Sequence, residues 1–151
     1  MSREGVRWCG ALLGAALLVA PGELAAQVKR EVQLAAVTAT AEPLAVTAGP
    51  GLAFRIGRRD RLVGWAGLGV ADGEFTARGD GAYHFLLTPE SRGAGVYLGG
   101  GVAAAEAGGW RGLLIGVAGI EAAPGARQGW FAEVGFGGGV RLAAGFRWRQ
   151  P

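Results

Sequence analysis

Apolar positions alternate with polar or small ones along most of this chain. The alternation is clearest over residues 74–88, where Tyr83 and Phe85 share one parity and Arg78 and Asp80 lie on the other. A repeat of two residues is typical of a β-strand whose two faces meet different surroundings. We therefore predict a strand here, with one apolar face and one polar face.

The same alternation, interrupted by turn signals, predicts about eight strands joined by short connections. The predicted strands are residues 32–41, 52–57, 62–70, 74–88, 96–102 and 111–121, with two more between 129 and 149. The proline-containing residues 41–51 are predicted to form a connection. Glycine recurs too often for a helix of useful length, the alanine-rich residues 102–107 excepted. These predictions together indicate an all-β fold, in which consecutive strands pair as an antiparallel meander.

The stretch GWFAEVGFGGGVRLAAGFRWR, residues 129–149, has apolar even positions and many glycines or charges at odd ones. As one strand it would span nearly 70 Å at about 3.3 Å per residue, so it must fold back. A three-residue loop at the triple glycine pairs Phe136 with Val140 and preserves parity across the turn. In that register Glu133 lies diagonal to Arg141, within reach of an ion pair.

The first 26 residues have the organisation of a secretory signal peptide. Arg3 and Arg7 precede an apolar stretch over residues 8–20, and small residues follow as far as Ala26. Thirteen or so apolar residues are fewer than the roughly 20 that span a bilayer. We predict cleavage after Ala26, which divides the chain into a signal peptide (1–26) and a single domain (27–151).

Composition narrows the possible functions of the mature domain. The chain has 151 residues, 30 of them glycine, and a formal charge of +3. Its basic residues are nearly all arginines and form no compact run, which argues against a nucleic-acid surface. The single cysteine, Cys9, lies in the predicted signal peptide. Disulfide bonds and thiol chemistry are therefore not expected in the mature chain.

Two-faced strands of this kind suit either of two closed architectures. In water the apolar faces would turn inward, as in a soluble barrel or sandwich, whereas in an outer membrane they would turn toward lipid. The alternation alone does not separate these possibilities. The predicted signal peptide, the hydrophobic mature chain and aromatic residues near strand ends favour the membrane.

Over residues 32–149 the chain resembles the small, about eight-stranded bacterial outer-membrane β-barrel proteins. The resemblance rests on strand number, alternation and the final aromatic strand, residues 140–149. It implies an up-and-down β-barrel that contacts outer-membrane lipid and is inserted by the barrel-assembly machinery. Members of this class usually end on an aromatic residue, whereas here Trp148 is followed by three further residues. With both termini periplasmic, the outer connections after the first would also be unusually short.

Candidate catalytic groups are scarce. His84 is the only histidine, and Ser91 is the only serine outside the predicted signal peptide. Seven residues of extended chain would hold them about 20 Å apart, too far for a catalytic triad. The His-x-Ser pairing of barrel-shaped lipid A deacylases is also missing, because Phe85 and Leu86 follow His84. We expect no enzyme activity.

No bound cofactor or metal is expected either. One histidine and no mature cysteine provide little for a metal site. The glycine clusters at 67–69 and 135–139 are not followed by helices, so they are not dinucleotide-binding fingerprints. Glycines in turns and in tightly coiled strands explain both clusters.

One set of polar residues shares the parity that would face the interior of a barrel. The set comprises Arg78, Asp80, His84, Glu133, Arg141 and Arg147. Interiors of eight-stranded barrels are just wide enough for side chains, so these residues are predicted to fill the lumen with ion pairs. A small-ligand pocket remains the other possibility.

These observations predict a monomeric outer-membrane barrel with a structural or interaction role, without catalysis and without a wide pore. The alternative is a soluble calyx, secreted or periplasmic, that binds a small apolar ligand. That alternative requires the leucine, valine and phenylalanine side chains to face inward. The direction of the apolar face therefore discriminates between the two functions.

Overall fold

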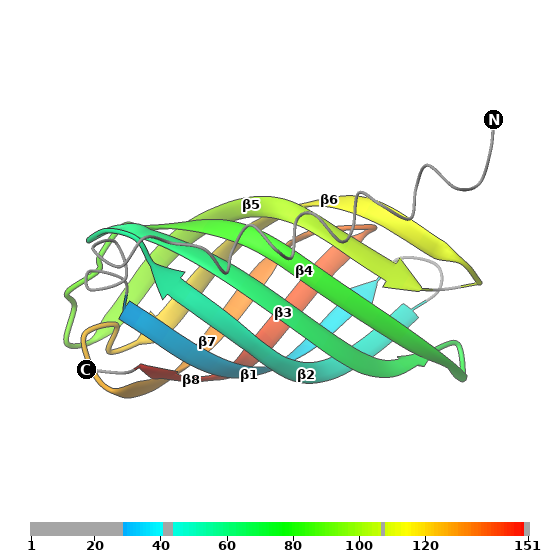
Figure 1. Ribbon diagram of the computed structural model, residues 1–151, viewed down its shortest axis with the longest axis horizontal. Coiled ribbons are helices and arrows are strands. Elements are labelled where there is room, and N and C mark those ends of the chain that lie inside the picture. Colours follow the sequence, from blue (N-terminus) through cyan, green and yellow to red (C-terminus); the bar gives the residue numbers. More distant parts are fainter. Residues whose placement is uncertain (1–28, 41–43, 107, 150–151) are drawn as a thin grey trace, which may run out of the picture.

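The computed structural model describes residues 29–40, 44–106 and 108–149, and the predicted signal peptide lies outside them. The described residues form eight strands that close into one barrel in chain order, with every neighbouring pair antiparallel (Figure 1). The strands are β1 (Lys29–Thr40), β2 (Leu44–Arg55), β3 (Asp60–Ala71), β4 (Glu74–Leu86), β5 (Ala94–Glu106), β6 (Trp110–Ala122), β7 (Gln128–Phe136) and β8 (Val140–Arg149). The predicted all-β, eight-stranded, up-and-down barrel is confirmed.

The register fixes how steeply the strands tilt. From Arg30, the cross-strand pairs pass once around the barrel and return to β1 at Thr40, ten residues further along. Such a stagger tilts the strands by about 35–45° from the barrel axis. The longer strands, of 12 or 13 residues, then cover about 30 Å along that axis at about 3.3 Å per residue.

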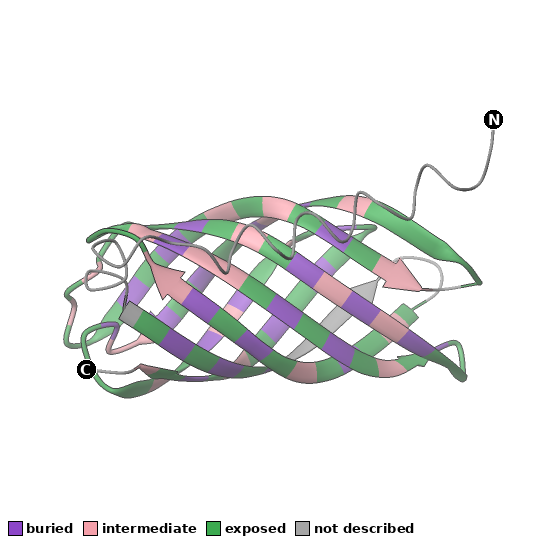
Figure 2. Ribbon diagram, viewed as in Figure 1, coloured by how far each residue is buried: buried purple, intermediate pink, exposed green. Residues whose placement is uncertain are grey.

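The two faces of the wall differ sharply in burial, and Figure 2 shows the alternation along each strand. Inward positions are buried, and most of the charged residues of the strands lie there. Outward positions carry large apolar side chains, including Leu68, Phe75 and Leu114, which are 61%, 69% and 76% exposed. Among strand residues with described side chains, charges with outward parity occur only at strand ends, at Arg30, Asp60 and Glu106.

The prediction that residues 41–51 form a connection is wrong, because β2 begins at Leu44. Proline lacks the N–H that a central strand needs, which made Pro50 look like the end of a strand. In the barrel, the β2–β3 pairing skips Gly49 and Pro50, resuming at Gly51. The Trp65 indole N–H donates to the Gly49 carbonyl oxygen at 2.9 Å. A side chain therefore supplies a hydrogen bond where the backbone pairing of β2 and β3 is interrupted.

The structure corrects one further local prediction, at residues 102–107, and confirms another, the C-terminal hairpin. The alanine-rich residues 102–107 were the exception to the exclusion of helices, but β5 continues as a strand to Glu106 because β6 pairs along its whole length. The C-terminal hairpin is confirmed, with Phe136 opposite Val140. Positive φ angles at Gly138 (80°) and Gly139 (126°) make the turn, a backbone conformation that glycine adopts without steric cost.

The two ends of the barrel differ in their connections. We call the end where β1 begins and β8 ends the terminal end. Its connections are residues 56–59, 87–93 and 123–127. At the opposite, hairpin end, only two or three residues separate consecutive strands. The shortness expected of the second, third and fourth connections at this end is confirmed. Among the described residues, no helix is long and apolar enough to cross a membrane.

Several glycines make room for large side chains inside the barrel. The rings of Trp65, Tyr97 and Phe131 lie where a Cβ atom at Gly67, Gly119 and Gly145 would stand. The Trp65 ring covers a glycine of its own strand, and the other two rings cover a glycine of the neighbouring strand, which lets aromatic groups lie flat in a narrow lumen. The high glycine content of the strands therefore serves interior packing as well as turns.

The alanine variants of two β6 glycines test this role of glycine. We expect Gly119→Ala to lower the free energy of unfolding by about 1–3 kcal/mol, because the added methyl meets the fully buried Tyr97 ring. Gly112→Ala is the matched control, since nothing lies within 4 Å of its Cβ position. There we expect a gain of about 0.4–1 kcal/mol from the stiffer unfolded chain. Urea unfolding of both variants measures the difference, and equal effects would contradict the packing role.

Candidate functional site

All six residues predicted to face the interior are buried there, and five of them belong to two charge clusters at different heights of the lumen. The central cluster comprises Arg78, Asp80, Glu133 and Arg141. The terminal cluster, nearer the terminal end, comprises Glu31, Arg55, Arg61, Glu121, Arg147 and Arg149. His84 belongs to neither cluster and stacks on Tyr97.

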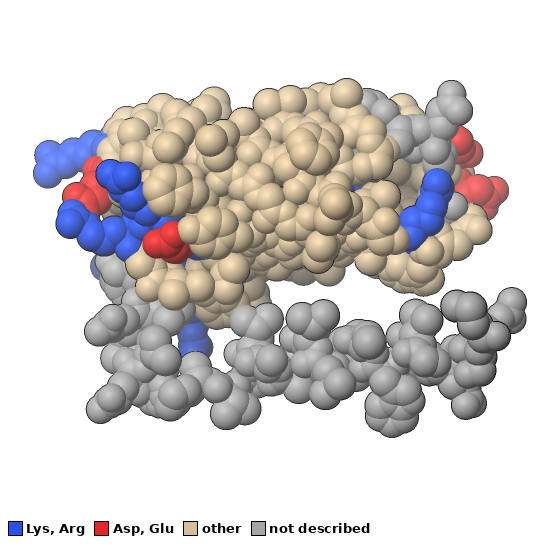
Figure 3. All heavy atoms as spheres, turned by 90° about the horizontal axis from the view of Figure 1, so that it is seen from above, with Lys and Arg blue, Asp and Glu red and all other residues tan. Residues whose placement is uncertain are grey.

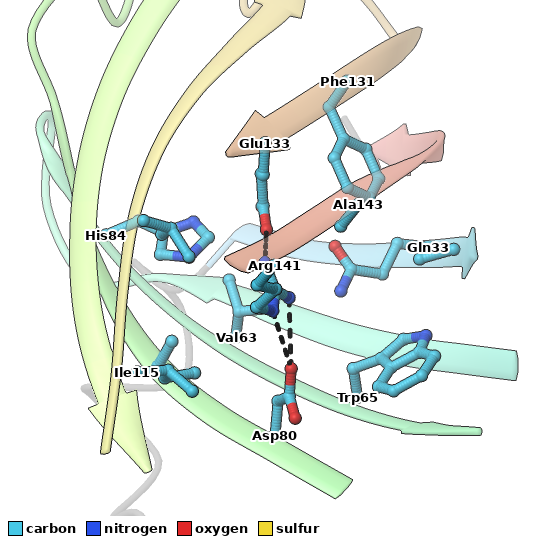
Figure 4. A pocket seen from close by; sticks show the side chains of 13 residues that line it. Gln33, Val63, Trp65, Asp80, His84, Ile115, Phe131, Glu133, Arg141 and Ala143 are labelled. Atoms are coloured by element: carbon cyan, nitrogen blue, oxygen red, sulfur yellow. Dashed lines mark hydrogen bonds and ion pairs between the residues drawn. The ribbon is translucent and has the colours of Figure 1, made fainter. Parts of the chain in front are cut away.

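The central cluster is a chain of alternating charges across the lumen. Figure 4 shows its members Glu133, Arg141 and Asp80. Arg141 Nη1 donates to Glu133 Oε2 at 2.7 Å, which confirms the ion pair predicted from the hairpin register. Arg141 Nη2 donates to Asp80 Oδ2 at 3.1 Å, and Arg78 Nε donates to Asp80 Oδ1 at 2.7 Å. Two guanidinium groups thus meet two carboxylates, and the cluster is electrically balanced.

The central cluster also extends toward both ends of the barrel. On one side the Tyr97 hydroxyl donates to Glu133 Oε1 at 2.8 Å. On the other side Arg78 Nη1 donates to the Gly137 carbonyl oxygen at 3.4 Å. The triple-glycine turn is therefore tied to the polar interior, which explains why Gly137 is buried although it lies in a turn.

The terminal cluster is organised around two carboxylates. Glu121 Oε2 accepts hydrogen bonds from Arg61 at 2.9 Å, Arg147 at 2.5 Å and Arg149 at 3.0 Å. Glu31 Oε1 accepts one from Arg55 Nε at 2.9 Å. Arg61, Arg147, Glu31 and Glu121 are at most 1% exposed. Four guanidinium groups share two carboxylates, which leaves two positive charges in excess.

Neutral groups stabilise the excess charge. The guanidinium carbon of Arg147 lies 4.4 Å from the Phe131 ring centroid, and that of Arg61 lies 4.9 Å from the Tyr97 centroid. A cation over an aromatic face is attracted by the negative face of the ring, most strongly where water is excluded. Gln33 Oε1 adds a neutral acceptor for Arg147, at 3.1 Å from Nη2 and 3.2 Å from Nε.

The β6–β7 connection closes the terminal end of the lumen over this cluster. Its Pro124 is fully buried, and its carbonyl oxygen accepts a hydrogen bond from Arg55 Nη2 at 3.0 Å. The Ala126 carbonyl oxygen accepts one from Arg149 Nη1 at 3.1 Å. Ala123 donates its N–H to the Gly93 carbonyl oxygen at 2.6 Å, which joins this connection to the β4–β5 connection. Arginines of the interior thus hold the cap in place.

His84 and Ser91, the candidate nucleophile–base pair, are not brought together. The imidazole of His84 faces the lumen, where its ring centroid lies 4.8 Å from that of Tyr97 and its Nδ1 lies 3.4 Å from Arg61 Nη2. Ser91 lies in the β4–β5 connection, where its Oγ accepts the N–H of Gly93 at 3.2 Å. Among the described residues, no three histidine, cysteine or acidic side chains are grouped for a metal ion.

A cavity of about 20 Å³ lies between the two clusters, lined by Asp80, His84, Glu133, Arg141 and Gln33 among others (Figure 4). That volume holds roughly one water molecule. Sites for drug-sized ligands usually enclose about 300 Å³ or more. The cavity therefore leaves no space for such a ligand between the clusters.

The sequence-based interpretation missed most of the terminal cluster. Glu31 precedes the predicted start of the first strand, and Arg61 lies between the predicted strands 52–57 and 62–70. The parity that identified Arg147 holds for Tyr97 and Glu121 within the predicted strands, and it reaches Glu31 and Arg61 once the strands are given their full lengths. Parity alone could therefore have found the first two residues, and longer strands the other two.

Comparisons with known proteins identify the fold but no family. No family model and no curated protein matches the chain. Among solved structures, the N-terminal β-barrel domain of OprF from Pseudomonas aeruginosa is similar, with a TM-score of 0.66 and 11% sequence identity. The match covers 81% of this chain and 97% of that domain. The match confirms that the chain has the barrel fold of the class it was predicted to resemble. At 11% identity, a structural match shows the fold alone.

Substitutions that remove or add one carboxylate test the excess of positive charge in the terminal cluster. We expect Glu121→Gln to lower the free energy of unfolding by about 3–5 kcal/mol, because three buried guanidinium groups lose their shared carboxylate. Gln33→Glu is the matched exchange in the opposite direction. It should cause no loss, because it places a carboxylate of the same shape beside Arg147, where positive charge is in excess. Denaturant unfolding measures both effects. An equal loss of unfolding free energy in Gln33→Glu and Glu121→Gln would contradict the excess of positive charge.

Proposed function

We propose that this chain is a small barrel of the bacterial outer membrane, with a structural or interaction role, no catalysis and no wide pore. The observation that carries the proposal is the direction of the two faces. A continuous apolar surface faces outward, while charged side chains fill the interior. Transmembrane barrels have this inside-out arrangement, since every lipid-facing position must be apolar.

Aromatic side chains at both ends of the outer face support membrane insertion. At the terminal end, Trp130 lies opposite Phe146 and Trp148 lies opposite Gln128, as the hairpin register predicted. At the hairpin end, Phe75 and Trp110 are 69% and 68% exposed. Indole and phenol rings prefer the boundary between hydrocarbon and headgroups. The strand length of about 30 Å along the axis also matches the thickness of a bilayer core.

The distribution of charge over the outer surface also supports the proposal. Figure 3 shows a broad band without charged side chains, with acidic and basic residues gathered at the two ends. At the terminal end these residues include Arg58, Arg59 and Glu90, and at the hairpin end Asp72 and Glu74. We place the terminal end on the periplasmic side. The short hairpin connections would then be all that this domain presents at the cell surface.

The contents of the lumen support the non-catalytic, non-porous part of the proposal. Buried ion pairs cross the interior at two heights, and the β6–β7 connection covers one end. His84 and Ser91 point to different environments. The soluble-calyx alternative requires apolar side chains around an internal pocket, whereas Leu34, Val134 and Leu142 face outward and are about half exposed.

Membrane insertion can be tested with two arginine substitutions on the outer face. We expect the refolded protein to need detergent or lipid and to show a heat-modifiable gel shift. In lipid, Leu142→Arg, in the middle of the wall, should lower the free energy of unfolding by about 2–4 kcal/mol. Gln128→Arg, at the end of a strand, should lower it by about 0–1 kcal/mol. Urea unfolding in vesicles provides both values. Solubility without detergent, or equal costs at the two depths, would contradict a membrane location.

Vesicles that contain the barrel test the filled lumen. Because the described interior encloses space for about one water molecule between its charge clusters, we expect no release of trapped disaccharide above that of protein-free vesicles. A porin of known wide pore, reconstituted at the same protein-to-lipid ratio, is the positive control. Rapid disaccharide release by this barrel would contradict the absence of a wide pore.

A further inference from the structure

An open groove of about 720 Å³ lies outside the lumen at the terminal end, between the β2–β3 and β4–β5 connections. One connection contributes Arg58 and Arg59, and the other contributes Thr88, Glu90 and Ser91. Asp60, at the start of β3, also lines the groove, and its carboxylate accepts a hydrogen bond from the Tyr83 hydroxyl. Phe85, an outward residue near the end of β4, also lines the groove. The groove is therefore continuous with the apolar outer face of the barrel.

The groove offers several donors to an anion. The guanidinium carbon of Arg59 lies 5.9 Å from the Phe85 ring centroid, and Arg59 forms no ion pair with any residue that the structure describes. Thr88 Oγ1 accepts the N–H of Val96 at 2.9 Å, and Ser91 Oγ accepts that of Gly93 at 3.2 Å. A hydroxyl that accepts one hydrogen bond can still donate its own proton. Both hydroxyls can therefore donate to a phosphate in the groove.

The groove also offers an acceptor for a cation. Arg58 Nε and Nη2 both donate to Glu90 Oε1, at 3.2 and 2.6 Å, which leaves Oε2 without a hydrogen bond in the structure. The neighbouring Arg58 guanidinium holds the pKa of the Glu90 carboxyl below its ordinary value, so this group is ionised at neutral pH. The two side chains are 83% and 71% exposed, and ion pairs so exposed exchange partners at little cost.

We propose that this groove binds the phosphoethanolamine headgroup of a membrane phospholipid, a proposal that rests on the membrane location argued above. The phosphodiester accepts hydrogen bonds from Arg59, Thr88 and Ser91. The ammonium group donates to Glu90 Oε2. The acyl chains continue along the outer face past Phe85 and Tyr83. A zwitterionic headgroup matches a groove that contains guanidinium groups and carboxylates together, whereas a purely anionic headgroup leaves Glu90 unmatched.

Lipid retention by the detergent-solubilised full chain tests this site. The protein is incubated with phosphatidylethanolamine, phosphatidylcholine or phosphatidylglycerol of identical acyl chains, and bound lipids are counted by native mass spectrometry. We expect phosphatidylethanolamine to be retained about tenfold more strongly than the other two, the worth of one charge-assisted hydrogen bond. Choline has no N–H to donate, and glycerol carries no cation.

Variants assign the preference to particular side chains. Arg59→Ala should weaken the retention of all three lipids, because each contains the phosphodiester that Arg59 binds. Glu90→Gln should remove its advantage over phosphatidylglycerol while phosphate binding persists. Arg127→Ala is the control, because Arg127 is an exposed arginine of the β6–β7 connection that does not line the groove. It should leave the preference unchanged.

Three outcomes would overturn the proposal. They are equal retention of all three lipids, stronger retention of phosphatidylglycerol, and an advantage over phosphatidylglycerol that survives Glu90→Gln. A heat-modifiable gel shift, measured on the same samples, separates this failure from failure of the proposed function. A protein that folds and requires detergent but shows no headgroup preference contradicts only the groove.

Discussion

The rest of the structure depends on the closure of eight strands around a lumen that side chains must fill. A barrel of this strand number has an interior just wide enough for side chains. Its outer face is apolar, so most of the charged residues of the strands lie inside. Buried charges cost several kcal/mol each unless they are paired. The central cluster and the terminal cluster are two solutions to this requirement, and between them they leave a cavity of about 20 Å³.

The two clusters solve the requirement differently. The central cluster balances two arginines with two carboxylates, whereas the terminal cluster holds four arginines around two. Aromatic faces and backbone carbonyl groups compensate for the imbalance, and these come from Tyr97, Phe131 and the β6–β7 connection. Closure of the terminal end and burial of the excess charge are therefore one structural feature, because the cap supplies acceptors that the arginines need.

Much of the fold could be predicted because period-two alternation reports directly on the two faces of a wall. The Glu133–Arg141 pair was predicted because a short turn fixes the register of a hairpin. Pairings between strands distant in sequence were not predictable, such as that of Arg141 with Asp80, because they depend on the stagger of the closed barrel. The terminal cluster was missed for a local reason. Two predicted strands began one residue after Glu31 and Arg61, and the inward parity was not extended to these residues.

The filled lumen and the short hairpin connections restrict where this protein can interact with other molecules. Transmembrane barrels commonly carry their longer loops at the end away from the termini. Here the longer connections lie at the terminal end, and one of them, residues 123–127, is held by interior arginines as a cap. The connections at residues 56–59 and 87–93 instead border an open groove with charged and hydroxyl side chains. Because loops rather than the wall carry most recognition, the interaction role proposed for this barrel fits best at the end of the wall where its termini lie.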